Sequence, residues 1–469
     1  MTFVSFEFCV LFALVFVTFW SVGRASQNVL LLAASYVFYG WWDWRFLSLI
    51  AASTVLDYVV ARAIQQASSA KVRRALLLVS LLANLSLLGF FKYFNFFVDS
   101  LRAGLDGLGV GFLADGPTLE IVLPVGISFY TFQTLSYTID VYRGQLRACT
   151  SLIDFSLYVS FFPQLVAGPI ERATHFLPQI YGERLLTWDR VSRGSYLILF
   201  GCFKKLAVAD GVGPFVDGVF SDSSARGGEL LVAVYLFAFQ IYADFSGYSD
   251  IARGTAKLLG FDLMVNFRTP YFATNPSDFW RRWHISLSSW LRDYLYVPLG
   301  GNRRGRSRTY ANLMTTMVLG GLWHGAAWNF VLWGFYQGAL LCGFRLTQGD
   351  RPPTPSGLGV RLLKAFLFFQ LVCFGWLLFR CGSLSDCLVF GSRVLGGAAD
   401  GLALPALSPL VLASLLVLVA CDFMEYRSDD ARWYERWPLI LRTGLYAILL
   451  VLTMGGLLHR SNTFIYFQF

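Results

Sequence analysis

One histidine lies in an apolar stretch, where an ionisable ring is costly. His324 falls within LGGLWHGAAWNFVLWG, residues 319–334, among glycine and tryptophan residues. A neutral imidazole that titrates near pH 7 can take a proton from a hydroxyl group as that group attacks an acyl carbon. Burial in apolar surroundings also obliges the ring to find hydrogen-bonding partners. This stretch therefore predicts either a catalytic base or a structural histidine that a neighbouring group satisfies.

A second histidine lies in DFWRRWHISLSSWLRDYLYVPLGGNRRG, residues 278–305. If this stretch is plotted as a helix at 100° per residue, His284 falls on the tryptophan-rich arc that carries Trp280. Arg281 and Arg292 fall on the other, charged arc. The pattern predicts an amphipathic helix that lies along the cytoplasmic face of a membrane. A histidine on such a helix is more often structural than catalytic.

Charged residues near these stretches have structural explanations as well as functional ones. Asp244 and Asp250 lie in QIYADFSGYSDIARG, residues 240–254, and acids at the end of a span usually cap a helix or pair with a cation. Four arginines follow the second histidine: Arg303, Arg304, Arg306 and Arg308. A cytoplasmic loop explains this cluster fully, because such loops are rich in basic residues. Binding the phosphates of a nucleotide-type donor is the weaker interpretation.

Several common catalytic motifs are absent from the sequence. The chain has no HExxH zinc motif, no Walker A loop, no GxGxxG fingerprint and no GxSxG nucleophile elbow. Its 8 cysteines have no metal-ligand spacing, so no metal site is predicted. Of the 4 histidines, only His324 and His284 are in suggestive settings. The residues alone leave two classes open, a membrane acyl-transfer enzyme and a transporter.

The composition places these residues in a membrane protein. Of the 469 residues, 56% are hydrophobic and 14% are charged, whereas a soluble domain has about 25% charged residues. The net charge of +9 then indicates basic cytoplasmic loops and requires no nucleic-acid partner. We expect one membrane-embedded domain over residues 1–469, built from helices.

Roughly a dozen stretches are apolar enough for membrane segments of about 20 residues. The expected spans lie near 5–22, 28–43, 46–64, 75–97, 119–139, 195–219, 230–247, 310–344, 362–379, 408–424 and 438–458. Two shorter stretches, 152–168 and 384–398, are ambiguous. Basic residues on both sides of 152–168 favour a re-entrant or interfacial segment there.

The stretch 310–344 is too long for one straight membrane helix. Its roughly 35 residues would extend about 50 Å, against a hydrocarbon core of about 30 Å. Gly321 and Gly325 flank His324 and mark the expected place of a bend or break. A break there would bring the imidazole to a cavity lined by protein, which favours a catalytic role.

The two histidine-containing stretches resemble the paired signature of the membrane-bound O-acyltransferases. That signature is FWRRWHISLSSWLRDYLYVPLGGNR followed by LGGLWHGAAWNFVLWG. Further matching stretches are LLAASYVFYGWW (31–42), LPVGISFYTFQTLSYTIDVYRG (123–144), FFPQLVAGPI (161–170), DFSGYSD (244–250) and the terminal FIYFQF. The resemblance covers nearly the whole chain, is densest between 240 and 345, and is greatest to the bacterial branch that acetylates alginate.

The resemblance implies an all-α polytopic bundle of spanning, re-entrant and interfacial helices around a central funnel or tunnel. It implies a catalytic core at 240–345, with His324 as the catalytic histidine of the membrane interior. His284 matches the second important histidine, although many relatives have Asn or Asp there. We therefore expect His324 to act as a general base and His284 to orient the acyl donor from the cytoplasmic side.

The bacterial branch also implies a substrate, a location and partners. The expected reaction moves acetyl groups from cytoplasmic acetyl-CoA across the bacterial inner membrane, for O-acetylation of an exported polysaccharide such as alginate or cellulose. The expected partners are the lipid bilayer, serine-esterase-like acetyltransferases of the periplasm and the polysaccharide export machinery, with no bound cofactor. Two alternatives remain open: a flippase or channel for an acyl carrier, and a non-catalytic scaffold of the acetylation complex.

Overall fold

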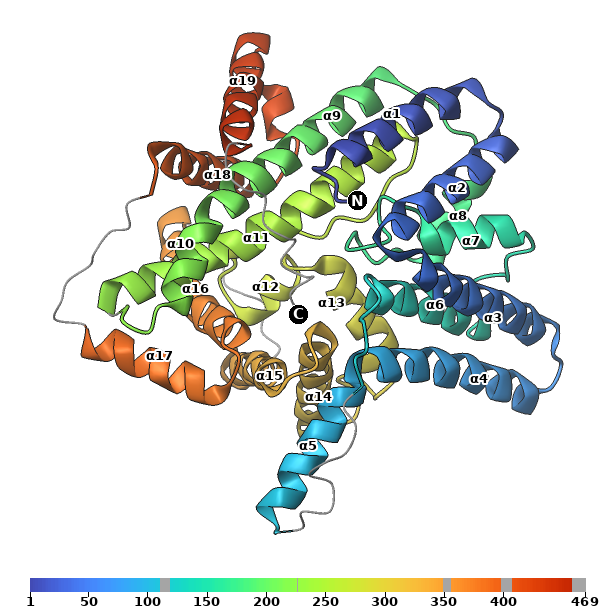
Figure 1. Cartoon of the computed structure of the whole chain (residues 1–469), viewed down its shortest axis with the longest axis horizontal. Helices are drawn as coiled ribbons and strands as arrows, with labels where there is room; N and C mark the ends of the chain where they lie inside the picture. Colours follow the sequence, from blue (N-terminus) through green and yellow to red (C-terminus); the bar gives the residue numbers. More distant parts are fainter. Residues whose placement is uncertain (110–118, 226, 349–355, 398–406, 458–469) are drawn as a thin grey trace. The chain divides into compact units, whose positions relative to one another are not determined.

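Helices make up all the regular secondary structure in the part of the chain that the structure describes, as the sequence predicts. The structure is a computed structural model, and the ranges it describes are 1–109, 119–225, 227–348, 356–397 and 407–457. The terminal motif FIYFQF falls outside these ranges. Figure 1 shows the helices in chain order.

Two compact units divide the chain. The first comprises residues 1–191 and 255–264, and the second comprises 192–254 and 265–469. The helices of the first unit are α1 (Phe6–Ser21), α2 (Arg24–Asp43), η1 (Trp44–Phe46), α3 (Leu47–Gln66), α4 (Ala70–Leu88), η2 (Gly89–Tyr93), α5 (Phe94–Gly107), α6 (Ile127–Tyr142), α7 (Leu152–Ser160) and α8 (Ala173–Tyr181). Two further helices, α9 (Trp188–Cys202) and α11 (Gly227–Leu258), contribute residues to both units.

Both histidines of the sequence analysis belong to the second unit. Its helices are η4 (Phe203–Ala209), α10 (Asp210–Ser221), η5 (Pro270–Phe272), α12 (Pro276–Trp280), α13 (Ile285–Leu291), η6 (Arg292–Tyr296), α14 (Arg306–His324), α15 (Trp328–Gln348), α16 (Leu358–Arg380), α17 (Leu384–Gly396), α18 (Pro409–Ser428), η8 (Trp433–Arg436) and α19 (Leu439–Gly456). The segment 265–305, which contains His284, has only short helices joined by turns and loops.

Six helical stretches within the described residues are long and apolar enough to cross a membrane. They are Arg24–Gln66, Ala70–Gly107, Gly227–Leu258, Leu358–Arg380, Pro409–Ser428 and Leu439–Gly456. The protein is therefore a polytopic membrane protein. The predicted span at 119–139 starts late, because regular helix begins only at Ile127. At 152–168 the helix α7 has 9 residues, too few to cross the ~30 Å hydrocarbon core.

Glycine pairs allow α9 and α11 to approach closely within the second unit. A Cβ atom on Gly247 would lie 2.7 Å from the carbonyl oxygen of Gly201, and one on Gly254 would lie 2.6 Å from that of Gly194. Small residues at such contacts let two helix backbones pack against each other. This contact places Asp244 and Asp250 of α11 beside Lys205 and Lys204, which follow α9.

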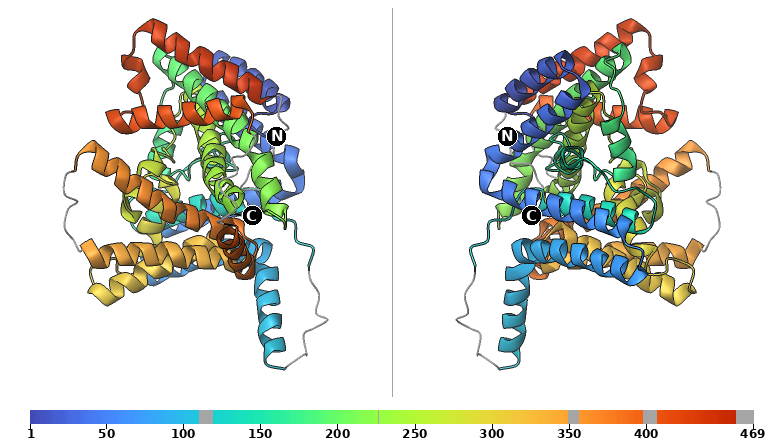
Figure 2. Two further views of the ribbon diagram at one scale, coloured as in Figure 1. Left: turned by 90° about the vertical axis from the view of Figure 1, so that its left-hand side faces the viewer. Right: turned by 90° about the vertical axis from the view of Figure 1, so that its right-hand side faces the viewer.

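A hairpin of α14 and α15 carries His324 at its tip. The two helices lie side by side in Figures 1 and 2, and residues 325–327 join them. A Cβ atom on Gly321 would lie 2.2 Å from the carbonyl oxygen of Phe330, and one on Gly334 would lie 2.4 Å from that of Met317. The glycines therefore permit the close packing of the hairpin, and the predicted break beside His324 is confirmed.

Candidate active site

His284 lies in a sharp turn between two short helices. Asn275 caps α12 by accepting a hydrogen bond from the backbone N–H of Asp278 (2.9 Å), and Pro276 occupies the first turn. The helix ends at Trp280, and His284 has φ 42° and ψ 54°, the left-handed conformation. A left-handed residue interrupts a right-handed helix. The prediction of one continuous amphipathic helix over 278–305 is therefore wrong.

Asn266 holds the backbone that follows His284. The backbone N–H of Ile285 donates to the Asn266 carbonyl oxygen (2.9 Å), and the Ser286 hydroxyl donates to Asn266 Oδ1 (2.6 Å). The Asn266 side-chain amide in turn donates to the Ser249 hydroxyl on α11 (3.2 Å). A left-handed non-glycine residue costs about 1–2 kcal/mol, so these buried hydrogen bonds stabilise a strained turn.

The His284 side chain is completely buried. Its ring lies 4.7 Å from the ring of Phe245 and 6.0 Å from that of Trp323, measured between centroids. Burial lowers the pKa of His284 to about 3, because the charged form loses its hydration. At neutral pH the side chain is therefore an uncharged imidazole, which can donate one hydrogen bond and accept another.

His324 is the last residue of α14 and is 6% exposed. Three aromatic rings surround it, with centroid distances of 5.1 Å to Trp323, 5.1 Å to Trp333 and 5.6 Å to Phe379. The next residue, Gly325, has extended backbone, which any residue can adopt, but its Cβ atom would lie 2.1 Å from the Phe330 ring. The glycine is required by the Phe330 ring, which in turn packs against Phe379 with ring centroids 4.9 Å apart.

The fold brings the two predicted histidines together. The ring centroids of His284 and His324 are 6.5 Å apart, and the ring planes are inclined at 67°. His284 comes from the turn before α13, whereas His324 comes from the tip of the α14–α15 hairpin. Their closeness fits a shared site, and the chemical role of each remains a prediction.

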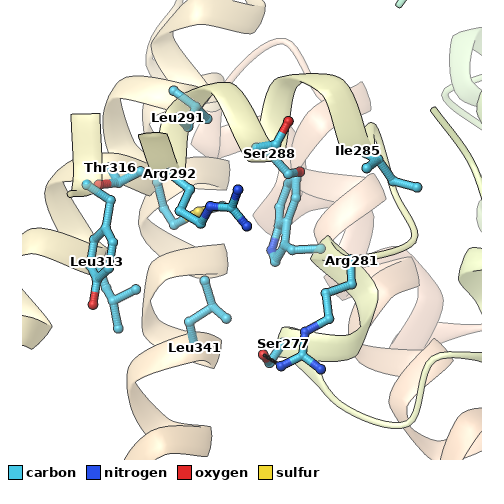
Figure 3. A pocket seen from close by; sticks show the side chains of 13 residues that line it. Ser277, Arg281, Ile285, Ser288, Leu291, Arg292, Leu313, Thr316 and Leu341 are labelled. Carbon is cyan, nitrogen blue, oxygen red and sulfur yellow. Dashed lines mark hydrogen bonds between the residues drawn. The ribbon is translucent and has the colours of Figure 1, made fainter. Parts of the chain in front are cut away.

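A cavity of about 490 Å³ lies in the same unit, and its lining includes Ile285 but neither histidine. Its 13 lining residues are Ser277, Trp280, Arg281, Ile285, Ser288, Ser289, Leu291, Arg292, Tyr296, Leu313, Thr316, Met317 and Leu341 (Figure 3). The volume lies within the range of small-molecule sites. Ile285 directly follows His284, and the Trp280 ring lies 5.9 Å from the Trp333 ring that contacts His324. The wall of the cavity is thus continuous with the surroundings of both histidines.

Two arginines in this wall were not predicted as site residues from the sequence. Arg281 and Arg292 line the cavity, whereas their spacing placed them on the solvated face of an interfacial helix. The signal that could have found them is their position on both sides of His284. The basic cluster is exposed and does not line the cavity: Arg303, Arg304, Arg306 and Arg308.

Asp244 and Asp250 pair with lysines. Lys205 Nζ lies 2.9 Å from Asp244 and 2.9 Å from Asp210. Lys204 Nζ lies 2.8 Å from Asp250, which Arg253 also approaches at 3.1 Å. The structural interpretation of these acids therefore holds, since each has a cationic partner and neither lines the cavity. No group of three His, Cys, Asp or Glu residues that could hold a metal ion occurs within the described ranges.

Comparison with known proteins places this arrangement in a family. The sequence model described as MBOAT, membrane-bound O-acyltransferase family, matches residues 144–349, which include both histidines. A probable alginate O-acetylase of Azotobacter vinelandii is 42% identical over 82% of this chain and 76% of its own length. A peptidoglycan O-acetyltransferase of Helicobacter pylori is 34% identical, over 76% and 72%. A teichoic acid D-alanyltransferase of Streptococcus thermophilus is 28% identical, over 56% and 69%.

Proposed function

The chain belongs to the membrane-bound O-acyltransferase family, and we propose that it moves acetyl groups from cytoplasmic acetyl-CoA for the O-acetylation of an exported polysaccharide. As an O-acyltransferase, it must bring an acyl carbonyl and a nucleophilic hydroxyl to one base. The observation that carries the proposal is the buried pair His284 and His324, 6.5 Å apart, with a cavity of about 490 Å³ in the same unit.

His324 acts as the general base in the proposed reaction. The hydroxyl oxygen of the acceptor attacks the thioester carbonyl carbon while its proton passes to the His324 ring. The C–S bond then breaks, and the proton leaves with the thiolate sulfur. A single general base contributes roughly 10²–10⁴-fold in rate. The rigid aromatic cage supplies positioning, because Trp333 and Phe379 fix the plane of the ring.

His284 supports this reaction without carrying charge. A neutral imidazole can hydrogen-bond to the donor or to the attacking group, whereas an imidazolium would be costly at a site with no exposure. Its left-handed backbone is a strained feature held by buried hydrogen bonds, as is common where geometry serves function. We assign His284 the role of orienting the donor relative to His324.

The direction of the hairpin supports a cytoplasmic donor. Helix α14 begins at Arg306, within the arginine cluster at 303–308, and ends at His324. Basic loops lie in the cytoplasm, so the start of α14 is expected there. Leu313, Thr316 and Met317 line the cavity between that end of α14 and His324, so a donor that enters from the cytoplasm meets the cavity first. In the proposed arrangement, the protein lies in the bacterial inner membrane, and serine-esterase-like periplasmic acetyltransferases and the export machinery receive the acetyl group.

The relatives support an exported polymer as the final acceptor. The alginate O-acetylase and the peptidoglycan O-acetyltransferase both have names that specify acetylation of an extracytoplasmic polymer. We propose an exopolysaccharide such as alginate or cellulose, and the greater identity to the alginate relative favours the former. The two alternatives are a flippase or channel for an acyl carrier, and a scaffold.

The test is the acetyl ester content of secreted polysaccharide in a deletion strain that carries wild type or His324→Ala. Membrane levels are matched, and Arg436→Met, which alters an arginine that is 68% exposed, serves as the control. Loss of ester in His324→Ala alone, with its partners still co-purifying, supports acyl transfer through His324. Retained ester would refute it and favour the channel or the scaffold.

A further inference from the structure

Two arginines approach one cavity from the two sides of the His284 turn. Arg281 directly follows α12, and Arg292 begins η6 after the seven residues of α13. Figure 3 shows both side chains beside the space bounded by Leu313 and Leu341. Neither arginine is assigned a role by the reaction described above.

The cavity carries positive charge without acidic residues in its wall. None of its 13 lining residues is Asp or Glu. Arg281 donates one long hydrogen bond to the Ser277 hydroxyl (3.5 Å), and no carboxylate among the described residues forms an ion pair with it. Arg292 pairs with Asp293 (2.7 Å), but it remains 64% exposed on its side chain. The guanidinium groups therefore retain donors for an anion.

The remainder of the wall suits a longer ligand than a bare anion. Five hydroxyl-bearing residues line it beside the arginines: Ser277, Ser288, Ser289, Tyr296 and Thr316. Leu313, Met317 and Leu341 form an apolar side. An arm that alternates methylene and amide groups matches such a wall, because its amides can use the hydroxyls and its methylenes the apolar side.

We propose that Arg281 and Arg292 bind a phosphate group of the thioester donor, whose acylated arm extends along the cavity toward His324. The proposal rests on the proposed function and deepens it. Guanidinium groups match phosphate oxygens in geometry and charge, often through two parallel hydrogen bonds. The ligand class is a phosphate-linked thioester arm, free as acetyl-CoA or attached to a carrier protein.

Packed aromatic rings connect the wall of the cavity to the proposed base. Trp280 lines the cavity next to Arg281, its ring lies 5.9 Å from Trp333, and Trp333 lies 5.1 Å from His324. In the proposal, the acylated arm passes the Trp280 and Trp333 rings to present its carbonyl to His324, which does not itself line the cavity. The exposed cluster at 303–308 lies outside the cavity wall, where salt screens its attraction for phosphate.

The test measures binding of two thiols to the purified full chain by titration calorimetry. Coenzyme A carries phosphate groups and pantetheine carries none, so their ratio of dissociation constants isolates the phosphate contribution. We expect wild type to prefer coenzyme A by roughly 10- to 100-fold, as hydrogen bonds to charged groups predict. The double variant Arg281→Gln, Arg292→Gln should bring that ratio close to one and leave pantetheine binding unchanged.

A matched control and a competing variant complete the test. Arg432→Gln changes an arginine that is 53% exposed and does not line the cavity, so the preference should persist. A variant in which all four arginines at 303–308 are replaced by glutamine tests whether that exposed loop binds the phosphate instead. The proposal is overturned if the double variant keeps the preference, or if only the four-arginine variant loses it. If wild type binds neither thiol, both the acetyl-CoA donor and this site are refuted.

Free and carrier-bound donors are distinguished by a second titration. Acetyl-phosphopantetheine has the terminal phosphate common to both sources and lacks the nucleotide of acetyl-CoA. Equal affinity for the two compounds indicates that the arginines bind the shared phosphate. Tighter binding of acetyl-CoA, lost in the double variant, indicates that they bind the nucleotide phosphates. A preference for acetyl-CoA that survives in the double variant counts against the proposal.

Discussion

The ring of His284 lies 6.5 Å from the ring of His324, although the two residues come from different short segments of the second unit. His324 is held by the tip of a glycine-packed hairpin, and His284 is held by a strained turn. His324 is the last residue of α14, and His284 precedes α13, so each lies at the end of a helix and not within one. The separation between the rings therefore depends on local contacts, which single substitutions can remove.

Substitutions at His284 should separate its backbone role from its side-chain role. Asn tolerates the left-handed conformation, so His284→Asn should fold with near-wild-type stability, and its acetyl transfer should fall without being abolished. His284→Val should be less stable by about 1–2 kcal/mol or more, because a β-branched residue is strained at φ 42°. Thermal unfolding in detergent measures the difference. Equal melting temperatures for the two variants would show that the turn is not strained.

Asn266 should act as a positioning residue for His284. Asn266→Ala removes the acceptor for Ser286 and the donor to Ser249, which costs about 1–3 kcal/mol of stability. Because the side chain does not line the cavity, kcat should fall while the KM for the donor stays unchanged. Ser249→Ala removes only the remote contact and should change kcat less. A rise in KM without a fall in kcat would contradict the positioning role.

The helical membrane fold could be predicted because apolar runs and few charges reflect the solvent in which the chain folds. The break beside His324 was also predictable, since 310–344 exceeds the bilayer thickness. The turn at His284 was not, because a regular plot of residues 278–305 contains no signal for a left-handed residue. That conformation is stabilised by Asn266, 18 positions earlier, through contacts that only the tertiary structure provides.

The candidate site could be predicted only in part, because some of its residues are brought together by tertiary contacts. His284 and His324 stood out by residue type and by resemblance, whereas Arg281 and Arg292 looked like an ordinary charged helix face. The segment breaks at His284 and continues into η6, and both arginines line one cavity as a result. Asp244 and Asp250 show the converse, because their lysine partners follow α9 and become neighbours only when α9 packs on α11.

Close packing of the hairpin should make Gly321 intolerant of substitution. In Gly321→Ala the new methyl group would lie 2.2 Å from the Phe330 carbonyl oxygen, which is backbone and cannot move aside cheaply. We expect a loss of about 1–3 kcal/mol or more and lower activity, since His324 lies three residues away. Gly343→Ala on α15 has no atom within 4 Å and should stabilise by about 0.5–1 kcal/mol. Similar melting temperatures for the two variants would contradict this packing.

The first unit should become less stable as the pH rises above neutrality. His175 Nδ1 lies 2.8 Å from the carboxylate of the fully buried Glu171, and this hydrogen bond raises the pKa of His175 above its ordinary 6.5. The folded state therefore binds the proton more tightly than the unfolded state does. The resulting stability is complete below pH 6.5 and is lost as the pH rises through the folded-state value. Burial raises the pKa of Glu171, which acts in the same direction at lower pH.

Melting temperatures of the detergent-purified protein between pH 6 and pH 8.5 check this prediction. Arg172 and Asp262 also face the pair. Lys257 and Arg190 outweigh burial and lower the pKa of Asp262, so this carboxylate should contribute no slope in this range. His175→Gln should flatten the dependence. A slope of unchanged size in His175→Gln would assign the pH dependence to another group.

Lys205 should be essential for folding because it lies between two buried acids. Its ammonium group is 2.9 Å from Asp210 and 2.9 Å from Asp244, and the three side chains are at most 10% exposed. Lys205→Met would leave two carboxylates in a buried site without this cation, which costs about 3–5 kcal/mol. Arg436→Met breaks an ion pair in which the arginine is 68% exposed, and it should change the stability little.

Purification yield and melting temperature compare the two variants. The triple variant Lys205→Met, Asp210→Asn, Asp244→Asn should recover much of the lost stability. If Lys205→Met melted like Arg436→Met, the buried ion pairs would not stabilise the contact between α11 and the segment after α9.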